Sequence, residues 1–276
     1  MIRKLLLALA ASLAVLAAPS AAGAAQSSAT SSNWAGYVAA RLGVSFRHLS
    51  ATWVMPAVTC SPGRHAYSAN WVGLGGYRRS SSALEQIGTE ADCTSTGKAQ
   101  YAAWYELVPS APRAVRLTVR PGDTISASVG VTGHQVQLRL ANVTRGTVFF
   151  TRLRAARVST SSAEWIVEAP SACVSSSLGS SACRTLPLAN FGKTSFARTQ
   201  ATSTFGHTGI IADPAWSSVA ISLAADEGLF ARMDGSGVGI AAPGALAATG
   251  DAFEVDYSEA TAPAQTGPAG PPGQGL

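Results

Sequence analysis

The chain has 276 residues, of which 47% are hydrophobic and 13% are charged, and its formal net charge is +5. The apolar fraction excludes a chain that is disordered throughout, and the lack of a Gly-X-Y period or a charged heptad pattern excludes collagen and coiled coil. The length is enough for one large domain with a substantial core. Charged residues are scarce, and Ser, Thr, Gly and Val take their place, which favours strands and turns.

The first 25 residues are typical of a secretory signal peptide. Two cations at positions 3 and 4 precede an apolar run from Leu5 to about Ala18, and small residues follow as PSAAGAAQ. The run is shorter than the roughly 20 residues that a membrane span needs. We therefore expect cleavage near Ala22 to Ala25, secretion to the extracellular space, and no membrane association of the mature protein.

Short strand-like runs, separated by turn signals, follow to about residue 257. Polar and apolar residues alternate in Val115–Arg120 and Gln135–Leu140, and Asn142–Thr147 between two such runs predicts a hairpin turn. Only Val219–Met233 could hold a short helix. The pattern predicts one all-β, antiparallel sandwich or barrel over residues 26–259. Residues 260–276 are rich in Pro and Gly, which predicts a disordered tail.

Four cysteines in an exported chain predict two disulfides with three possible pairings. The sequence-local choice is Cys60–Cys93 with Cys173–Cys183. The four histidines are scattered, and neither CxxC nor HExxH occurs, so we expect no metal and no cofactor. The basic residues are spread along the chain and do not form a nucleic-acid footprint. Nothing indicates oligomerisation, so a monomer is the default expectation.

Three segments place polar residues inside apolar strands. Alternation puts these pairs on shared faces: Gln86 with Glu90, Trp104 with Glu106, and Glu164 with Glu168. Taken singly, polar residues on strands usually face solvent. Acids are rare in this chain, however, and here they cluster beside Trp and Tyr, which is compatible with a substrate groove.

The usual nucleophile signatures are weak or missing. There is no G-x-S-x-G elbow and no P-loop. One S-x-x-K occurs at Ser95–Lys98, but it lies in a turn-like stretch without its companion motifs, so we interpret it as a chance match.

An ordered set of segments resembles the glutamic peptidases, also called eqolisins. The main ones are SNWAGY at 32–37, ATWVMP at 51–56, WVGLGG at 71–76, EQIG at 85–88, YAAWYE at 101–106 and AEWIVE at 163–168. The resemblance implies a jelly-roll-like (concanavalin A-like) antiparallel β-sandwich of two bent seven-stranded sheets. It also implies that Gln86 and Glu168 are the catalytic pair, that Trp71 lies in the cleft, and that Tyr105 and Glu106 line or support the site.

The implied reaction is endopeptidase hydrolysis of proteins or peptides. Ionised Glu168 would be the general base that activates water, and the amide of Gln86 would donate to the oxyanion. Periodicity alone cannot choose between Glu164 and Glu168 as the base, and only the family motif favours Glu168. A carboxylate base leads us to expect an acidic to mildly acidic optimum.

Two other functions remain open at this point. A glycoside hydrolase could use paired acids on the same class of fold, but the backbones of Glu164 and Glu168 would lie ~13 Å apart. Glycosidase carboxylates need roughly 5 to 9.5 Å, so Glu106 would have to partner one of them. A non-catalytic, lectin-like binding module is the other alternative, in which Gln86 is an ordinary hydrogen-bonded strand residue.

Overall fold

The computed structural model describes residues 26–78, 80–175, 181–224 and 238–260, and over these ranges its regular structure is entirely β-strand. The strands are β1 (Gln26–Ser31), β2 (Trp34–Ala40), β3 (Phe46–Val54), β4 (Ala66–Gly75), β5 (Leu84–Cys93), β6 (Ala99–Val108), β7 (Arg113–Val115), β8 (Thr124–Thr132), β9 (Gln135–Asn142), β10 (Thr147–Arg154), β11 (Ser162–Glu168), β12 (Ser171–Ser175), β13 (Ser181–Thr185), β14 (Lys193–Ser203), β15 (Thr208–Gly209), β16 (Ser217–Leu223), β17 (Val238–Pro243) and β18 (Phe253–Ala260). The expected all-β class is confirmed.

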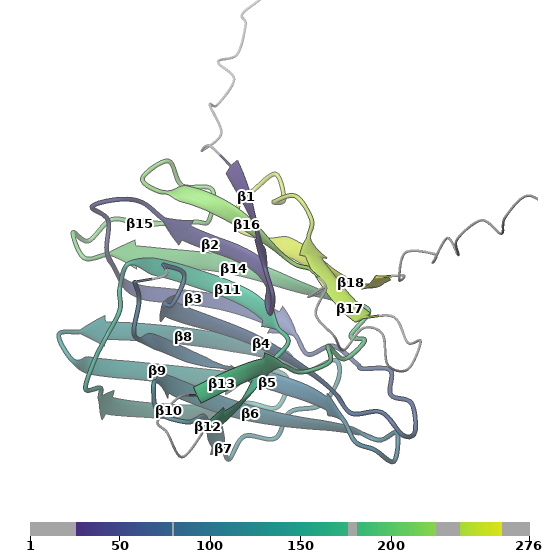
Figure 1. The fold of residues 1–276 in the computed structure, drawn as a ribbon. Helices are drawn as coiled ribbons and strands as arrows, with labels where there is room; N and C mark the ends of the chain where they lie inside the picture. The colour runs from purple at the N-terminus through teal and green to yellow at the C-terminus, as the bar shows by residue number, and fades with distance from the viewer. Residues whose placement is uncertain (1–25, 79, 176–180, 225–237, 261–276) are drawn as a thin grey trace, which may run out of the picture.

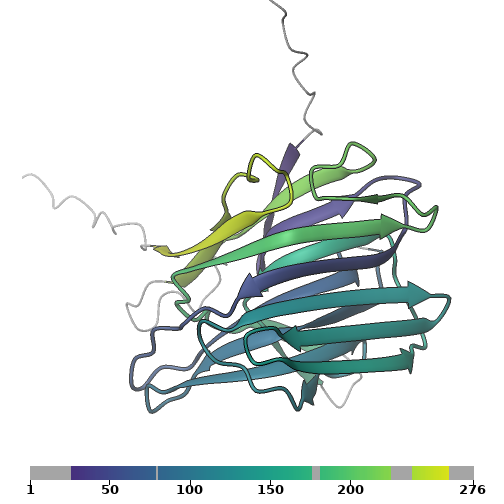
Figure 2. The same cartoon turned by 180° about the vertical axis from the view of Figure 1, so that it is seen from behind.

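The strands form two layers that pack face to face (Figures 1 and 2). The first layer has the order β10-β9-β8-β3-β14-β18-β17, and the second has the order β16-β2-β11-β4-β5-β6-β7. The layers join between β17 and β16, where Leu223 and Ala241 are the paired residues. The expected sandwich of two seven-stranded antiparallel layers is therefore confirmed, with a hydrogen-bonded join along one side.

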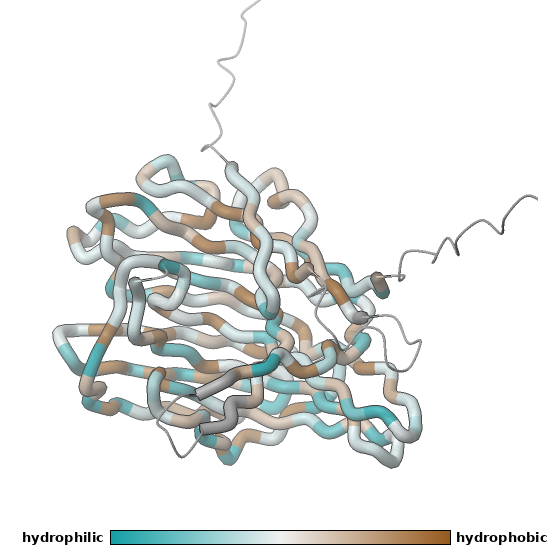
Figure 3. Tube along the Cα trace, viewed as in Figure 1, coloured by the Kyte–Doolittle hydropathy of each residue, from teal (hydrophilic) through white to brown (hydrophobic). Residues whose placement is uncertain are grey.

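Alternating side chains from both layers fill the space between them. The tube in Figure 3 shows the hydropathy changing along the strands. In β3, for example, Leu49, Ala51 and Trp53 point inward and are buried. Two tryptophans also make polar contacts across the layers. The indole nitrogen of Trp165 in β11 donates to the Ser50 carbonyl in β3 at 3.0 Å. That of Trp53 donates to the Thr89 hydroxyl in β5 at 3.0 Å. A typical net contribution of such a bond is about 1 kcal/mol, and here the bonds also fix the two layers relative to each other.

The central strands of the second layer are buried on both faces. In β2, β4 and β11 almost every residue is buried, so the outer face of these strands is covered as well as the inner one. A second apolar cluster lies there, around Trp71, Trp104 and Ile166. β1 pairs in parallel with β16 and contacts β2 beside this cluster (Figure 1). This covered outer face holds the predicted site.

Several local predictions can be compared with the structure. β9 and β10 are joined at Asn142–Thr147, so the predicted hairpin is confirmed. The Cys60–Cys93 disulfide is also confirmed. In the β12–β13 hairpin, Cys183 is disulfide-bonded and its backbone partner is Cys173, whose side chain lies outside the described part.

One prediction was wrong. Residues 219–223, the start of the segment that could have held a helix, lie in strand β16 (Ser217–Leu223), which pairs with β2 and buries Val219 and Ile221 against the outer cluster. The rest of that segment, from residue 225, lies outside the described residues. So do the expected signal peptide and all but the first residue of the expected tail. In the described ranges, no helix is long and apolar enough to cross a membrane.

Candidate active site

Five neighbouring strands of the second layer bring the predicted site residues onto one face. The strands β2, β11, β4, β5 and β6 are hydrogen-bonded in that order. Register aligns four residues in one row across β11 to β6, namely Glu164, Gly73, Gln86 and Glu106. Glu168 lies four residues further along β11. Because directly paired residues and every second residue of a strand share a face, all these residues lie on the outer face of the layer.

Trp71 connects the surroundings of Gln86 with Glu168. Gly88, its partner on β5, leaves room for it, since a Cβ there would lie 2.6 Å from the Cβ of Trp71. A Cβ on Gly73 would lie 3.0 Å from Cζ3 of Trp71 and 3.2 Å from the Cβ of Gln86. At the other end of the indole, Nε1 donates to Oε2 of Glu168 at 2.7 Å. The indole thus extends from the row of Gln86 to the carboxylate.

Both oxygens of Glu168 accept hydrogen bonds. Trp71 binds Oε2, and Nδ2 of Asn33 donates to Oε1 at 3.0 Å. The side chain of Asn33 is fixed in turn by Ser31, whose hydroxyl donates to Oδ1 of Asn33 at 3.2 Å. The same hydroxyl accepts from the backbone amides of Asn33 and Trp34. The turn between β1 and β2 therefore positions one donor to the carboxylate.

The pKa of Glu168 is raised to about 7. Burial is the main cause, because it disfavours the charged form, and the nearby negative charge of Glu106 adds to the effect. The hydrogen bonds from Trp71 and Asn33 act in the opposite direction, since they stabilise the carboxylate. The group can therefore take up and release a proton close to neutral pH.

Gln86 is 4% exposed and is fixed by Glu106. Its Nε2 donates to Oε2 of Glu106 at 2.7 Å, and its buried Oε1 has no partner among the described residues. Burial raises the pKa of Glu106, against the opposing effect of this bond. The amide of Gln86 has two N–H groups, so one remains for another acceptor. No hydrogen bond in the described structure joins Gln86 directly to Glu168, and Trp71 and Glu106 are the groups between them.

The five strands of the site face carry acidic residues but no basic ones. The sequences of β2, β4, β5, β6 and β11 contain no Lys or Arg. Further along β5, Glu90 and Asp92 share the face of Gln86. Burial raises the pKa of both, and that of Asp92 reaches about 7, partly through repulsion by Glu90. Burial thus favours the neutral form of these two carboxyl groups.

The model of the Peptidase A4 family matches residues 32–221, which is more than half of the chain and includes Gln86 and Glu168. This chain belongs to the Peptidase A4 family. It is thus a peptide hydrolase, and the resemblance to the glutamic peptidases is confirmed. Membership favours this function over the glycoside hydrolase and the lectin-like module.

Solved structures of glutamic peptidases are similar in fold to this Peptidase A4 protein. Scytalido-glutamic peptidase with a transition state analog inhibitor is 25% identical, with a TM-score of 0.60, over 82% of this chain and 98% of that chain. The same enzyme with a peptide based transition state analog gives 24% identity and a TM-score of 0.57, with the same coverage. SCP-B, a member of the eqolisin family in a complex with the tripeptide Ala-Ile-His, is 24% identical with a TM-score of 0.56. The match covers 82% of this chain and 98% of that chain. No curated protein sequence matches the chain.

Two other predicted site residues of the peptidase, Tyr105 and Glu164, are placed differently. Tyr105 points away from the site face, and Glu164 is closed to solvent. Tyr105 faces the interior of the sandwich, because alternation along β6 points it opposite to Glu106, and its ring stacks on Phe149 at 6.0 Å. Its ring therefore does not point to the side of Gln86 and Glu168, and its expected role in lining or supporting the site stays a prediction. Glu164 is on the correct face but is 0% exposed, so its carboxyl group is closed to solvent.

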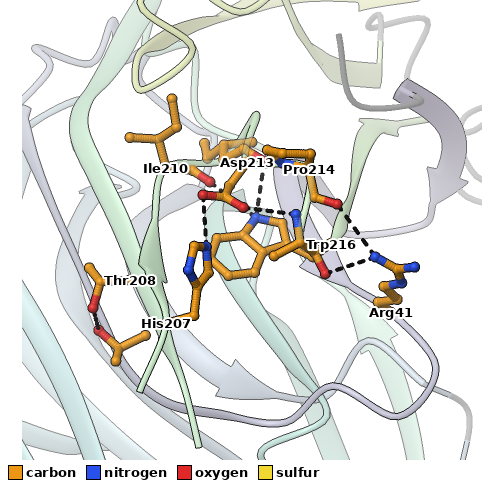
Figure 4. A network of polar contacts seen from close by, with 10 residues as sticks. Arg41, His207, Thr208, Ile210, Asp213, Pro214 and Trp216 are labelled. Atoms are coloured by element: carbon orange, nitrogen blue, oxygen red, sulfur yellow. Dashed lines mark hydrogen bonds and ion pairs between the residues drawn. The ribbon is translucent and has the colours of Figure 1, made fainter. Parts of the chain in front are cut away.

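A second polar cluster of the peptidase lies at the β14–β15 turn and the loop before β16 (Figure 4). Nε2 of His207 lies 3.0 Å from Oδ2 of Asp213, and the ring of His207 packs edge-on against Trp216. Trp216 donates to two backbone carbonyls of the same loop. Among the described residues, no hydroxyl or thiol forms a hydrogen bond with the ring of His207, so these contacts fit a role in holding the loop. No group of three metal-ligating side chains is found in the described residues either.

Proposed function

We propose that this protein is a secreted glutamic endopeptidase in which Glu168 is the general base and Gln86 stabilises the oxyanion. The observation that carries the proposal is the Glu168 carboxylate, bound by Trp71 and Asn33 on the same face as the Gln86–Glu106 pair. A carboxylate with a pKa of about 7 suits proton transfer, since such transfer is most efficient when the pKa lies near the working pH.

The reaction needs three events. Glu168 accepts a proton from a water molecule, and the water oxygen forms a bond to the carbonyl carbon of the peptide. The second N–H of Gln86 then donates to the oxyanion, while its first N–H stays on Glu106. The C–N bond breaks as Glu168 passes its proton to the leaving nitrogen. The products are a new carboxylic acid and a new amine, and Glu168 returns to its ionised form.

The pH optimum follows from the carboxyl groups of the site. A base is active when ionised, so activity should rise with pH toward the pKa of Glu168, which is about 7. Glu106 has a raised pKa and holds the amide of Gln86, so its ionisation adds a second negative charge beside the reacting centre. We therefore propose a mildly acidic optimum.

The cellular setting belongs to the same proposal. The apolar segment over residues 1–25 would direct export, residues 26–259 would form the peptidase domain, and residues 260–276 would be a disordered tail. The Cys60–Cys93 disulfide supports an oxidising environment. The mature enzyme would be a monomer that acts on protein or peptide substrates.

The proposal is tested by digesting casein and a peptide library with purified enzyme from pH 3 to 8 and identifying the products by mass spectrometry. We expect internal cleavage with new free amines, an optimum on the acid side of neutral, and no inhibition by pepstatin or metal chelators. Loss of activity with a chelator or with a serine-directed reagent would contradict the mechanism. Release of reducing sugar from glycans without peptide cleavage would contradict the proposed function.

A further inference from the structure

An open polar pocket, in which Arg198 and Gln200 are exposed, lies on the opposite side of the sandwich from the Gln86–Glu168 face. It occupies about 340 Å³ on the outer face of the first layer, over β3, β8 and β14. Figure 2 shows the molecule from the side of these strands. Its lining includes the polar residues Ser50, Thr52, Ser126, Arg198, Gln200 and Asp251. The outer positions of β3 and β8 contribute hydroxyls, because their alternate residues point into the core. This pocket is therefore separate from the proposed dyad.

The floor of the pocket contains an irregular stretch of β14. The register with β3 shifts between Ala197 and Gln200, and within this bulge Arg198 has a φ of 53°. A positive φ favours glycine, and a large side chain there is strained. The bulge is fixed by Thr199, whose amide and hydroxyl both donate to the carbonyl of Asp251, at 3.0 and 2.8 Å. Bulges of this kind often direct a side chain toward a functional position.

The pocket holds opposite charges that do not neutralise each other. In the described part of the chain, the guanidinium of Arg198 makes no hydrogen bond or ion pair. Asp251 accepts from the hydroxyl of Thr249 and forms no ion pair with Arg198. The hydroxyls of Ser50 and Ser126 also lack side-chain partners in these ranges. The lining thus offers a free cation, a carboxylate and neutral polar groups.

We propose that this pocket binds a short peptide with free termini, whose carboxylate contacts Arg198 and whose ammonium group contacts Asp251. A guanidinium binds a carboxylate through two parallel hydrogen bonds, which fits an unpaired Arg198. The hydroxyls and the amide of Gln200 match the N–H and C=O groups of a peptide bond. The volume lies at the lower end of small-ligand sites, which suits a dipeptide or tripeptide. Such zwitterions are what a peptidase releases, so the pocket would sense product.

The binding test uses the dipeptide Ala-Ala and isothermal calorimetry on the full protein. We expect wild type to bind Ala-Ala at millimolar concentration and to bind N-acetyl-Ala-Ala-amide, which has no charges, at least tenfold more weakly. Arg198→Gly removes the cation at a position where glycine is favoured, so it should lose at least tenfold in affinity while the melting temperature stays equal or rises. Asp251→Asn should lose affinity as well, because it removes the negative charge that would contact the ammonium group. The bulge should persist, since the backbone carbonyl of residue 251 still accepts from Thr199.

Two controls separate this pocket from the proposed dyad. Gln86→Ala should bind Ala-Ala at this pocket as wild type does, and Arg198→Gly should cleave peptides at the wild-type initial rate. Equal binding of Ala-Ala by wild type and Arg198→Gly would overturn the proposal. So would equal binding of the uncharged dipeptide, or binding of sulfate by wild type with no binding of Ala-Ala, since that would indicate a simple anion site.

Discussion

The indole nitrogen of Trp71 donates to Oε2 of Glu168 at 2.7 Å, on the face that also carries Gln86. The bond orients one carboxyl oxygen and stabilises the charged form of the group. It leaves the remaining lone pairs of that carboxylate for a water molecule. The tryptophan is therefore as important to the proposed chemistry as to the packing of the outer cluster.

Replacing Trp71 with Phe should raise the pKa of Glu168. The variant keeps an aromatic ring against Trp34, which lies edge-on at 5.0 Å, but it loses the donor. Hydrogen bonds to charged groups are worth about 1.5 to 3 kcal/mol, so we expect kcat/KM at pH 5 to fall at least tenfold. The acid limb of the pH–rate profile should move to higher pH. An unchanged limb would mean that the bond does not tune the base.

Asn33→Ala should have a similar but smaller effect. It removes the donor to Oε1 while Trp71 still holds Oε2. We predict a several-fold loss of kcat/KM and a shift of the acid limb in the same direction, measured on one fluorogenic peptide. Ser31→Ala should show part of this effect, because the hydroxyl of Ser31 fixes the side chain of Asn33. If Asn33→Ala changes the melting temperature and leaves the limb in place, the role of Asn33 is structural only.

Gln86→Ala should lower kcat by about 10² to 10³, the range for removing one oxyanion donor. KM should change little, because the donor acts on charge that develops during the reaction. Gln86→Glu is the matched variant of similar size: it supplies a second acid beside Glu106, so its activity should be as low. A Gln86→Ala enzyme with normal kcat would exclude Gln86 from the transition state.

Stability should decrease as pH rises, and Glu164 is one reason. Burial raises the pKa of Glu164 well above its ordinary value of 4.5, and that of Glu85, which carries a neighbouring charge, rises to about 8. Between the ordinary pKa of 4.5 and the raised pKa of the folded state, the folded protein holds protons that the unfolded chain releases. The free energy of unfolding therefore falls from about pH 4.5 to 8. The stabilisation from these two protonated groups is complete below pH 4.5 and is lost as the pH rises through their pKa values in the folded state.

Glu164→Gln should therefore weaken the dependence of the free energy of unfolding on pH. The variant should match wild type at pH 4 and exceed it at pH 8 by roughly 1 to 3 kcal/mol, since its side chain cannot become charged in a fully buried position. Thermal unfolding at both pH values measures this. Glu254→Gln, on an exposed ion pair with Lys193, is the control and should change little. Equal pH slopes for Glu164→Gln and wild type would contradict the account.

The sequence predicted the strands and their faces well, because alternation is a strong signal in half-buried strands. It placed Gln86, Glu106, Glu164 and Glu168 on shared faces, and the register of β11, β4, β5 and β6 puts these faces together. The sandwich and the two-layer strand count came from the family resemblance. Alternation could not give the order of strands that lie far apart in sequence.

Other features depended on tertiary contacts that no local pattern carries. Asn33 lies in a motif that the resemblance included, but its bond to Glu168 joins residues 135 apart in sequence. Tyr105 adjoins Glu106 in the motif, yet successive strand residues face opposite sides, so it packs on Phe149. Residues 219–223 are apolar enough for a helix or a strand, and pairing with β2 decides between them.

The most direct test of the account is the rate of peptide cleavage by Glu168→Gln beside Glu164→Gln, measured from pH 3 to 8 on one substrate. Glutamine preserves the size of the side chain and can still accept from Trp71 or Asn33, so the Glu168→Gln fold should persist, which circular dichroism checks. We predict that Glu168→Gln loses turnover at every pH while Glu164→Gln keeps most of it. Near-normal cleavage by folded Glu168→Gln, or loss confined to Glu164→Gln, would contradict the assignment of the base.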